Sequence, residues 1–440
     1  MAPDPQQDYV FKVVEGRGIH FIRFWFTDVL GTLKSFAITP GELEDAFAEG
    51  IGFDGSAIDG FTGPDESDIL AFPDPETFQL LPWRPSTDGV GRMFCNVYAN
   101  DGKPFEGDPR HILKRVLRQA ADMGYTFNVG PELEYYYFKS PDDLTPLDQG
   151  GYFDLTSTDS GSDLRRDTIF TLEKLGITVE YSHHENGPSQ QEIDLRFSDA
   201  LTMADNVMSY RLAVKQVARQ HGLYASFMPK PLNGAPGSGM HVHQSLFTEE
   251  GKNAFFDPSD PLGYNLSEVA KHYIAGLIAY APEYMLVTNQ YVNSYKRLAG
   301  SEVSPRLTWA RQNREAMLRI PAYKPGKEDA CRIELRTPDP ACNPYLAFAA
   351  MLAAGLKGIE DGLELPPEYK GKGDDSTGSA APQLPTTLGE AIDCFEGSGL
   401  MREVLGDHVF NYLVRVKREE WNSYCSYVSP WEIGRHMATL

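Results

Sequence analysis

The alternation of apolar and polar residues predicts mainly strands and turns over the first hundred residues. Residues 18–27 have the aromatic and β-branched composition of a strand, and a turn-rich segment follows at 28–31. A stretch with prolines at 64, 73, 75, 82 and 85 separates this strand from a second one predicted at 92–98. This part of the chain therefore predicts a small β-rich domain.

Helical spacing begins near residue 108. Asp108 and Pro109 are residue types that begin a helix, apolar residues then recur at helical spacing to Met123, and Gly124 is a residue type that ends one. Further helices are predicted over residues 163–175, 200–220, 266–288, 344–361 and 387–396, and an exposed loop over 366–387. The predicted fold class is therefore α+β, with a small domain of residues 1–105 and a large one of residues 106–440.

The segment 125–138 places carboxylates where a core is expected. If it forms a strand, its period of two puts Glu132 and Glu134 on one face with Tyr136 and Phe138. Both faces are largely apolar, so the two glutamates have no obvious solvated side. One interpretation is a strand end with its acids at the rim. The other is a pair of semi-buried carboxylates, which are costly unless a cation compensates them.

Three further segments repeat this pattern of charged and apolar faces. Glu192, Asp194 and Arg196 alternate with Ile193, Leu195 and Phe197; His241, His243 and Ser245 share one face of residues 237–246; Arg332, Glu334 and Arg336 alternate with Ile333 and Leu335. Each segment alone is typical of a half-exposed strand with a solvated face. Placed together in one sheet, they would line a concave face with oxygen ligands, imidazole and arginines.

This set of residue types predicts divalent cations next to a phosphate group. Glutamate oxygens with one histidine suit Mg²⁺ or Mn²⁺, and the lack of clustered cysteines argues against structural zinc. Cations beside arginines are what phosphoryl transfer requires, because charge spreads over the transferred oxygens. The chain has no Walker A motif. Arg297, Arg311, Arg314 and Arg319 form a further basic cluster, for which a surface salt-bridge network is the alternative. Asp54 lies in a glycine-rich turn, for which a structural Asx turn is the alternative.

Charge and cysteine content narrow the class of protein. The net charge of −22 argues against nucleic-acid or anionic-membrane partners, because phosphate would be repelled. Five scattered cysteines without a C-x-x-C pair favour a reducing compartment. The N-terminal residues lack the pattern of a signal peptide, and the longest apolar run is too short to span a bilayer. We therefore expect a cytoplasmic protein.

Taken in order, the motifs resemble those of bacterial type I glutamine synthetases over nearly the whole chain. They are Glu132-Leu-Glu134, His183-His-Glu185, Gln191-Glu192, Gly237-Ser-Gly-Met-His241, Asn293-Ser-Tyr-Lys-Arg297, Asn313-Arg314, Arg332-Ile-Glu-Leu-Arg336 and Asn343-Pro-Tyr345. The resemblance implies a β-grasp N-terminal domain and a catalytic domain whose antiparallel sheet lines the active site. It also implies a homo-oligomer, a dodecamer of two stacked six-membered rings, with active sites between neighbouring subunits.

The resemblance also implies a role for each matching residue. One cation would be held by Glu134, Glu185 and Glu192, and the other by Glu132, His241 and Glu334. ATP would be bound by Glu180, His243, Ser245 and Arg332. Glutamate would be bound by Gly237, Arg297 and Arg336. The transferred phosphoryl group would be steadied by Arg314, with Arg319 nearby. The amine would be held or deprotonated by Asp54 of the adjacent subunit with Tyr152, and the site would be closed by Glu302.

The implied activity is a ligase that uses ATP to activate the γ-carboxylate of glutamate and forms an amide with ammonia. Three departures from the family pattern bear on this: Ala57 replaces a serine of the ammonium site, Pro236 replaces an asparagine, and the segment before Glu302 is one residue short. Loss of the serine hydroxyl suits an alkyl-ammonium better than ammonium, because the former has fewer N–H groups to satisfy. Actinobacterial γ-glutamylpolyamine synthetases resemble this chain in the alanine. An organic amine, such as a polyamine, ethanolamine or methylamine, is therefore the alternative acceptor.

A catalytically silent relative that acts as a binding or sensor protein is the third hypothesis. The retained set of acids and arginines argues against it. Tyr369 matches poorly the tyrosine that is adenylylated in enterobacterial members, so we predict no such regulation.

Overall fold

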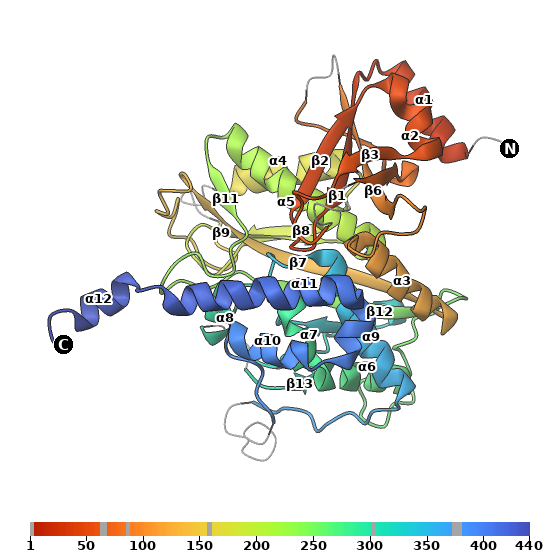
Figure 1. Ribbon diagram of the computed structural model, residues 1–440. Helices are drawn as coiled ribbons and strands as arrows, with labels where there is room; N and C mark the ends of the chain where they lie inside the picture. Colours follow the sequence, from red (N-terminus) through yellow and green to blue (C-terminus); the bar gives the residue numbers. More distant parts are fainter. Residues whose placement is uncertain (1–3, 62–67, 85–88, 156–160, 301–304, 372–380) are drawn as a thin grey trace.

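The computed structural model describes residues 4–61, 68–84, 89–155, 161–300, 305–371 and 381–440. In Figure 1 the N-terminal strands lie at the upper right, above a larger body of helices and strands. The C-terminal helix α12 extends away from that body. Strands and helices occur in both parts, which confirms the predicted α+β class.

The N-terminal sheet has the strand order β2-β1-β6-β4-β3, with β5 paired to β6. Its strands are β1 (Phe21–Thr27), β2 (Leu33–Ile38), β3 (Ile51–Asp54), β4 (Asp68–Pro73), β5 (Gln79–Leu80) and β6 (Val90–Ala99). The helical segments are α1 (Pro5–Gly16), the short 3₁₀ turns η1 (Pro40–Glu42) and η2 (Pro75–Thr77), and α2 (Leu43–Glu49). Val14 of α1 and Leu43 of α2 pack with Phe24 and Met93 of the sheet.

Both strands predicted in this region are present as β1 and β6, and they are accompanied by two helices that were not predicted. Helix α1 was not predicted, although Asp4 caps it and Pro5 begins it, the same signal that was recognised at Asp108 and Pro109. Helix α2 was also missed. Its seven residues are too short for a periodic pattern to stand out.

The large sheet has the strand order β13-β14-β15-β12-β7-β9-β8, with β10 and β11 also paired to β7. Its strands are β7 (Tyr125–Phe138), β8 (Val179–His184), β9 (Gln190–Leu195), β10 (Ser198–Asp199), β11 (Tyr224–Ser226), β12 (Met240–Thr248), β13 (Trp309–Ala310), β14 (Leu318–Arg319) and β15 (Ile333–Leu335). All pairs are antiparallel except β13 with β14. The predicted antiparallel sheet is therefore confirmed.

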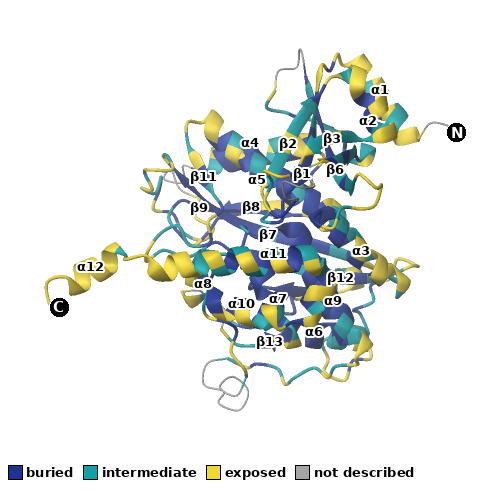
Figure 2. Cartoon of the chain, viewed as in Figure 1, coloured by how far each residue is buried: buried dark blue, intermediate teal, exposed yellow. Residues whose placement is uncertain are grey.

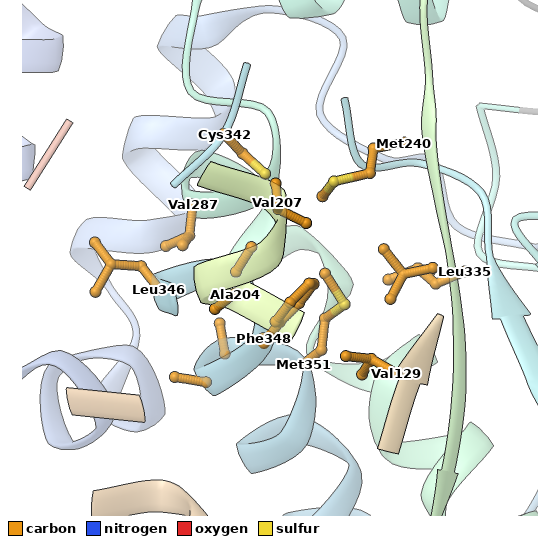
Figure 3. Packing of buried hydrophobic residues seen from close by; sticks show 14 of the residues in the cluster. Val129, Ala204, Val207, Met240, Val287, Leu335, Cys342, Leu346, Phe348 and Met351 are labelled. Carbon is orange, nitrogen blue, oxygen red and sulfur yellow. The ribbon is translucent and has the colours of Figure 1, made fainter. Parts of the chain in front are cut away.

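Helices pack behind and around this sheet. They are α3 (Pro109–Asp122), α4 (Ser162–Lys174), α5 (Ala200–Gln220), α6 (Glu268–Ala279), α7 (Ala281–Thr288), α8 (Val292–Ala299), the 3₁₀ turn η3 (Glu328–Ala330), α9 (Pro344–Glu360), α10 (Leu388–Glu396), α11 (Gly399–Ser426) and α12 (Pro430–His436). Figure 3 shows Val207 of α5 and Phe348 and Met351 of α9 packed near Val129 and Leu335 of the sheet. Figure 2 shows this interior as buried and α12 as exposed.

Most predicted helices are present, with one correction. The helix expected over 266–288 is divided into α6 and α7 at Tyr280, because Pro282 lacks the N–H that a continuous helix would need. Helices α8, α11 and α12 were not predicted. Among the described residues, no helix is both long and apolar enough to cross a bilayer.

A buried ion network joins the N-terminal sheet to the larger part. Nη2 of Arg110 on α3 lies 2.9 Å from Oδ2 of Asp74 and 3.0 Å from Oδ2 of Asp205 on α5. The hydroxyl of Tyr345 on α9 donates to Oδ1 of the same Asp205 at 2.5 Å. The four side chains of this network come from distant segments of the chain, and the network helps to fix how the two parts are placed.

Candidate active site

The carboxylates of the large sheet lie on one face because of the strand register. Glu132 of β7 is directly opposite Asp194 of β9 on one side and His241 of β12 on the other, and Glu134 is opposite Glu192. Residues directly opposite each other in an antiparallel pair point to the same face. Phe127, Val129 and Leu133 of β7 are in the buried core. The predicted alternation along residues 125–138 is therefore confirmed, and the interpretation as buried carboxylates is correct for Glu134, which is 7% exposed.

Glu132, His241 and Glu334 form the first acidic group, in which one ligand atom from each lies within 4.8 Å of the others. Nδ1 of His241 is 3.3 Å from Oε2 of Glu132 and 3.9 Å from Oε1 of Glu334. These are the three residues predicted to hold one cation. Burial lowers the pKa of His241 to about 4, so its imidazole is neutral near pH 7, the form that binds a cation.

Two histidines stabilise the negatively charged form of Glu132. Burial opposes its ionisation, but hydrogen bonds with His241 and His243 hold its pKa well below the ordinary value. Nε2 of His243 lies 2.6 Å from Oε1 of Glu132. The Glu132 carboxylate is therefore an ionised ligand between two imidazoles.

His183, Glu185 and Glu192 form the second acidic group, again with one ligand atom each within 4.8 Å. The sequence predicted Glu134 as the third ligand here, and that assignment stays a prediction. Oε2 of Glu134 accepts hydrogen bonds from the Gly239 N–H at 2.9 Å and from Nε2 of Gln190 at 3.0 Å. His183 was not predicted as a ligand, although its alternation with Glu185 was a signal that could have indicated it.

The second acidic group has more negative charge than the chain compensates. Burial raises the pKa of Glu185 and Glu192, and burial with the charge of Glu185 raises that of Glu134 to about 8. Oε2 of Glu185 is buried without a hydrogen-bond partner among the described residues. Carboxylate oxygens with one imidazole are ligands that Mg²⁺ and Mn²⁺ accept. Both acidic groups therefore fit a divalent cation.

The two acidic groups open into a first cavity of about 570 Å³. Its other walls bring together residues that the sequence predicted for substrate and phosphoryl binding, namely Tyr152, Gly237, Arg297, Arg314, Arg319 and Arg336. It is also lined by residues that were not predicted, namely Tyr181, Asn186, Gln190, Lys230, Gly234, Ala235, Pro236 and Gly300. A cavity with acids on one side and arginines on another can hold cations and an anionic substrate together.

The arginines of the first cavity are held in different ways. Nε of Arg319 donates to Oε2 of Glu334 at 2.6 Å, and Arg336 donates to the other oxygen of Glu334. Arg297 is bound by backbone carbonyl oxygens, with Nη1 2.6 Å from Thr337 O. Tyr152 beside Arg314 raises the pKa of that guanidinium through a hydrogen bond. Other groups of the protein therefore hold each of these four guanidinium groups in place.

Gly237 is required where the chain passes Arg297. A Cβ atom at this position would lie 2.6 Å from Cγ of Arg297 and 2.7 Å from the carbonyl oxygen of Pro229. Its own carbonyl accepts a hydrogen bond from Nε2 of Gln190 at 3.0 Å. The glycine allows the backbone to approach Arg297 at the wall of the first cavity.

A second cavity of about 500 Å³ adjoins the first. It is lined by all four residues predicted to bind ATP, namely Glu180, His243, Ser245 and Arg332. Glu132 and Tyr181 line both cavities. Phe197, which was predicted to lie on the same apolar face as Ile193 and Leu195, also lines the second cavity and is 55% exposed, whereas those two residues are buried. The reason is that β9 ends at Leu195.

Asp54 lies outside both cavities, at the exposed end of β3. Its Oδ1 accepts a hydrogen bond from the Ser56 N–H at 2.8 Å, which is the Asx turn considered as the alternative. Helix α11 holds the same turn, with Nε2 of His408 2.8 Å from Gly60 O and the Tyr412 hydroxyl 3.1 Å from Oδ1 of Asp59. A role for Asp54 in an adjacent subunit stays a prediction. Glu302 lies outside the described residues.

Comparisons with known proteins agree with this geometry. Residues 18–100 match the family model described as glutamine synthetase, beta-Grasp domain, and residues 106–436 match that described as glutamine synthetase, catalytic domain. The chain is 51% identical over 448 residues to glutamine synthetase of Mycolicibacterium smegmatis, covering 99% of this chain and all of the relative. It is 48% identical over 444 residues to glutamine synthetase of Methanosarcina mazei, covering 98% of this chain and 97% of the relative.

Solved structures give the same result. The structure titled "Apo GmaS without ligand" superposes with a TM-score of 0.87 at 34% identity, covering 97% of this chain and 99% of that one. The structure titled "GmaS/ADP complex-Conformation 1" has a TM-score of 0.89 at 33% identity, with the same coverage. The β-grasp domain and the catalytic domain predicted from the sequence are thereby confirmed.

Proposed function

Because the chain belongs to the glutamine synthetase family, and is thus an ATP-dependent glutamate ligase, we propose that it joins the γ-carboxylate of glutamate to ammonia. ATP phosphorylates the carboxylate, ammonia attacks the resulting acyl phosphate, and ADP and phosphate leave. The observation that carries this proposal is the pair of adjoining cavities that share Glu132 and Tyr181. A phosphoryl group can pass from a nucleotide in the second cavity to a carboxylate in the first.

In this proposal the second cavity takes ATP and the first takes glutamate. Glu180, His243, Ser245 and Arg332 line the nucleotide side, and Gly237, Arg297 and Arg336 line the glutamate side. Arg314 and Arg319 stabilise the transferred phosphoryl group, because fixed positive charge in a partly enclosed site stabilises developing negative charge. The pairing of Arg319 with Glu334 supports this role, since it fixes the guanidinium at the cavity wall.

Mg²⁺ or Mn²⁺ would be held by Glu132, His241 and Glu334 in the first acidic group. The other ion would be held by Glu185 and Glu192, with Glu134 as predicted and His183 beside them. Bound cations would neutralise charge on the phosphoryl oxygens. The raised pKa values of Glu134, Glu185 and Glu192 support the second position, because a bound cation would compensate the negative charge that burial makes unfavourable there.

Asp54 of a neighbouring subunit, Tyr152 and Glu302 would bind the protonated amine and remove a proton before it attacks. The exposure of Asp54, away from the cavities of its own chain, supports an active site shared between subunits. We therefore propose the homo-oligomer of two stacked hexamers, and retain the cytoplasm as its location. The division into residues 1–105 and 106–440 is proposed on the same basis; β6 ends at Ala99 and α3 begins at Pro109.

An organic amine is the second candidate acceptor, and the residue that favours it is Ala57. A methyl group here removes a hydroxyl from the segment that also carries Asp54. The deciding assay measures phosphate release from ATP and glutamate with ammonium, methylamine, ethanolamine, putrescine or spermidine. Turnover with ammonium supports the first proposal. Turnover with an organic amine but not ammonium replaces it, and no turnover with any amine supports a catalytically silent protein.

A further inference from the structure

Asp194 is a buried carboxylate with no assigned role. It lies on β9, opposite Glu132 of β7 and Tyr181 of β8, and two residues from Glu192 on the same face. Its exposed fraction is 4%, yet it lines the second cavity. Within the described part of the chain, neither of its carboxylate oxygens has a hydrogen-bond partner.

Burying a carboxylate such as that of Asp194 costs free energy of folding unless hydrogen-bond donors or positive charge compensate it. Burial of a carboxylate without a donor loses its hydration and gains nothing in return. Two of its neighbours on this face, Glu132 and Glu192, are themselves carboxylates. Burial and the charge of Glu132 raise the pKa of Asp194, and Glu192, Tyr181 and His243 oppose this effect, but none of the three meets the geometry of a hydrogen bond to either oxygen. Both oxygens of Asp194 are therefore free, within the described residues, to accept hydrogen bonds from groups that bind in the cavities.

Asp194 is also placed beside both acidic groups without belonging to either. The first group includes its neighbour Glu132 and the second its neighbour Glu192, but the compact ligand sets leave Asp194 out. Mg²⁺ keeps several water molecules when it binds to proteins, and the protons of those waters need acceptors. Carboxylates that accept such hydrogen bonds orient the ion and strengthen its binding.

We propose that Asp194 is a positioning residue that accepts hydrogen bonds from the water molecules of the two cations, one toward each acidic group. The proposal rests on the cation sites of the proposed function. It explains why an aspartate is buried at this point with both oxygens unpaired. In this proposal Asp194 lines the second cavity but contacts the water molecules of the cations and not the nucleotide.

The test is Mn²⁺ binding to the full-length protein in the absence of ATP, glutamate and amine, measured by calorimetry for the native protein and Asp194→Asn. We expect binding about 10- to 100-fold weaker in the variant, with the number of bound ions unchanged. The metal-free variant should melt no lower than the native protein, because a buried unpaired charge has been removed. Affinity within about twofold of native would overturn the proposal. Loss of a whole equivalent of Mn²⁺ would also overturn it, because Asp194 would then be a direct ligand.

Asp28→Asn is the matched control. Asp28 is a fully buried carboxylate that directly follows β1, paired with Lys34 at 3.1 Å. Its replacement should change the melting temperature but not Mn²⁺ binding. If Asp194→Asn does not fold, a crystal structure of the native protein with Mn²⁺ decides. Metal-bound water within about 2.5–3.0 Å of each Asp194 oxygen supports the proposal, and oxygens without such water refute it. Because no substrate is present, a wrong amine assignment leaves this result unchanged.

Discussion

Nε of Arg319 lies 2.6 Å from Oε2 of Glu334, so a carboxylate placed to bind a cation is already paired with an arginine. Arg336 binds the other oxygen of the same side chain. Despite complete burial of Glu334, its pKa is lowered, with His243 and Arg336 opposing the effect of burial. If the proposed roles of Glu334 and Arg319 are correct, cation binding and phosphoryl binding are coupled, because both depend on the charges around Glu334.

Arg319→Gln should therefore have opposite effects on cation binding and turnover. Removal of the guanidinium leaves Glu334 more negative, so Mn²⁺ should bind about fivefold more tightly. Phosphate release should fall by about 100-fold or more, because a charge that stabilises the phosphoryl group is lost. Calorimetry measures Mn²⁺ binding, and a steady-state assay measures phosphate release. Arg311→Gln is the control, since Arg311 lines neither cavity. Weaker Mn²⁺ binding in Arg319→Gln would contradict the coupling.

Glu132→Ala or His241→Ala should abolish phosphoryl transfer and leave the fold largely intact. Each change removes a member of the first acidic group, in which Nδ1 of His241 is 3.3 Å from Oε2 of Glu132. We expect the rate of phosphate release to fall by at least about 100-fold, with an unchanged circular-dichroism spectrum. Near-normal rates in either variant would mean that the cation assignment is wrong.

The metal-free protein should lose stability as the pH rises. Burial and the charge of Glu185 raise the pKa of Glu134 from 4.5 to about 8, so the folded protein retains a proton that the unfolded chain releases. Since the folded state binds more protons between these values, the free energy of unfolding falls as the pH rises through this window. The melting temperature in EDTA, followed from pH 5 to pH 8 by calorimetry, measures the fall.

Glu134→Gln isolates this contribution from those of other groups. The stability of the variant relative to the native protein should rise across the same pH range, because the amide has no proton to lose. Parallel curves for the two proteins would contradict the assignment. Added Mg²⁺ should stabilise the native protein most near pH 8, because protons compete least with the cation for the Glu134 carboxylate at the upper end of this pH range.

Ala57→Ser should shift the acceptor preference toward ammonia. The new hydroxyl would lie in the turn that begins at Asp54 and offer a hydrogen bond that ammonium can use better than an alkyl-ammonium. The ratio of kcat/KM for ammonium to that for methylamine should rise about tenfold. The KM values for ATP and glutamate serve as the internal control. A ratio that does not change would remove Ala57 as a determinant of specificity.

Arg110→Ala should destabilise the protein by about 3–5 kcal/mol, because Asp205 would be left with a buried, uncompensated charge. The side chains of Arg110 and Asp205 are 5% and 8% exposed, respectively, and Arg110 also pairs with Asp74 of the N-terminal part. Urea unfolding followed by fluorescence measures the loss. Lys103→Ala removes an exposed partner of Asp101 and should leave the unfolding midpoint unchanged. Equal effects of the two changes would mean that the Arg110 network contributes little.

Much of the secondary structure could be predicted because it depends on neighbouring residues. Helix α5 covers the predicted range 200–220, and β7 covers 125–138. Two predictions differ from the structure. Asp4 and Pro5 are residue types that begin a helix, but helix α1 was not predicted, and the alternating pattern continues to Phe197 although β9 ends at Leu195. Long periodic segments carry a strong signal, whereas short elements depend on contacts that no local pattern records.

The sequence by itself determined which side chains could share a face, since alternation along a strand is a local property of the backbone. Glu132 and Glu134 were assigned to one face in this way, and both line the first cavity. Only the tertiary structure decided which strands lie next to each other and in what register. The observed register places His183 opposite Glu192 and the buried Asp194 opposite Glu132, and it allows the Gly239 N–H to donate a hydrogen bond to Glu134. A shift of one residue between two strands would turn every such side chain to the opposite face, and the energy that prevents it comes from packing across the whole sheet.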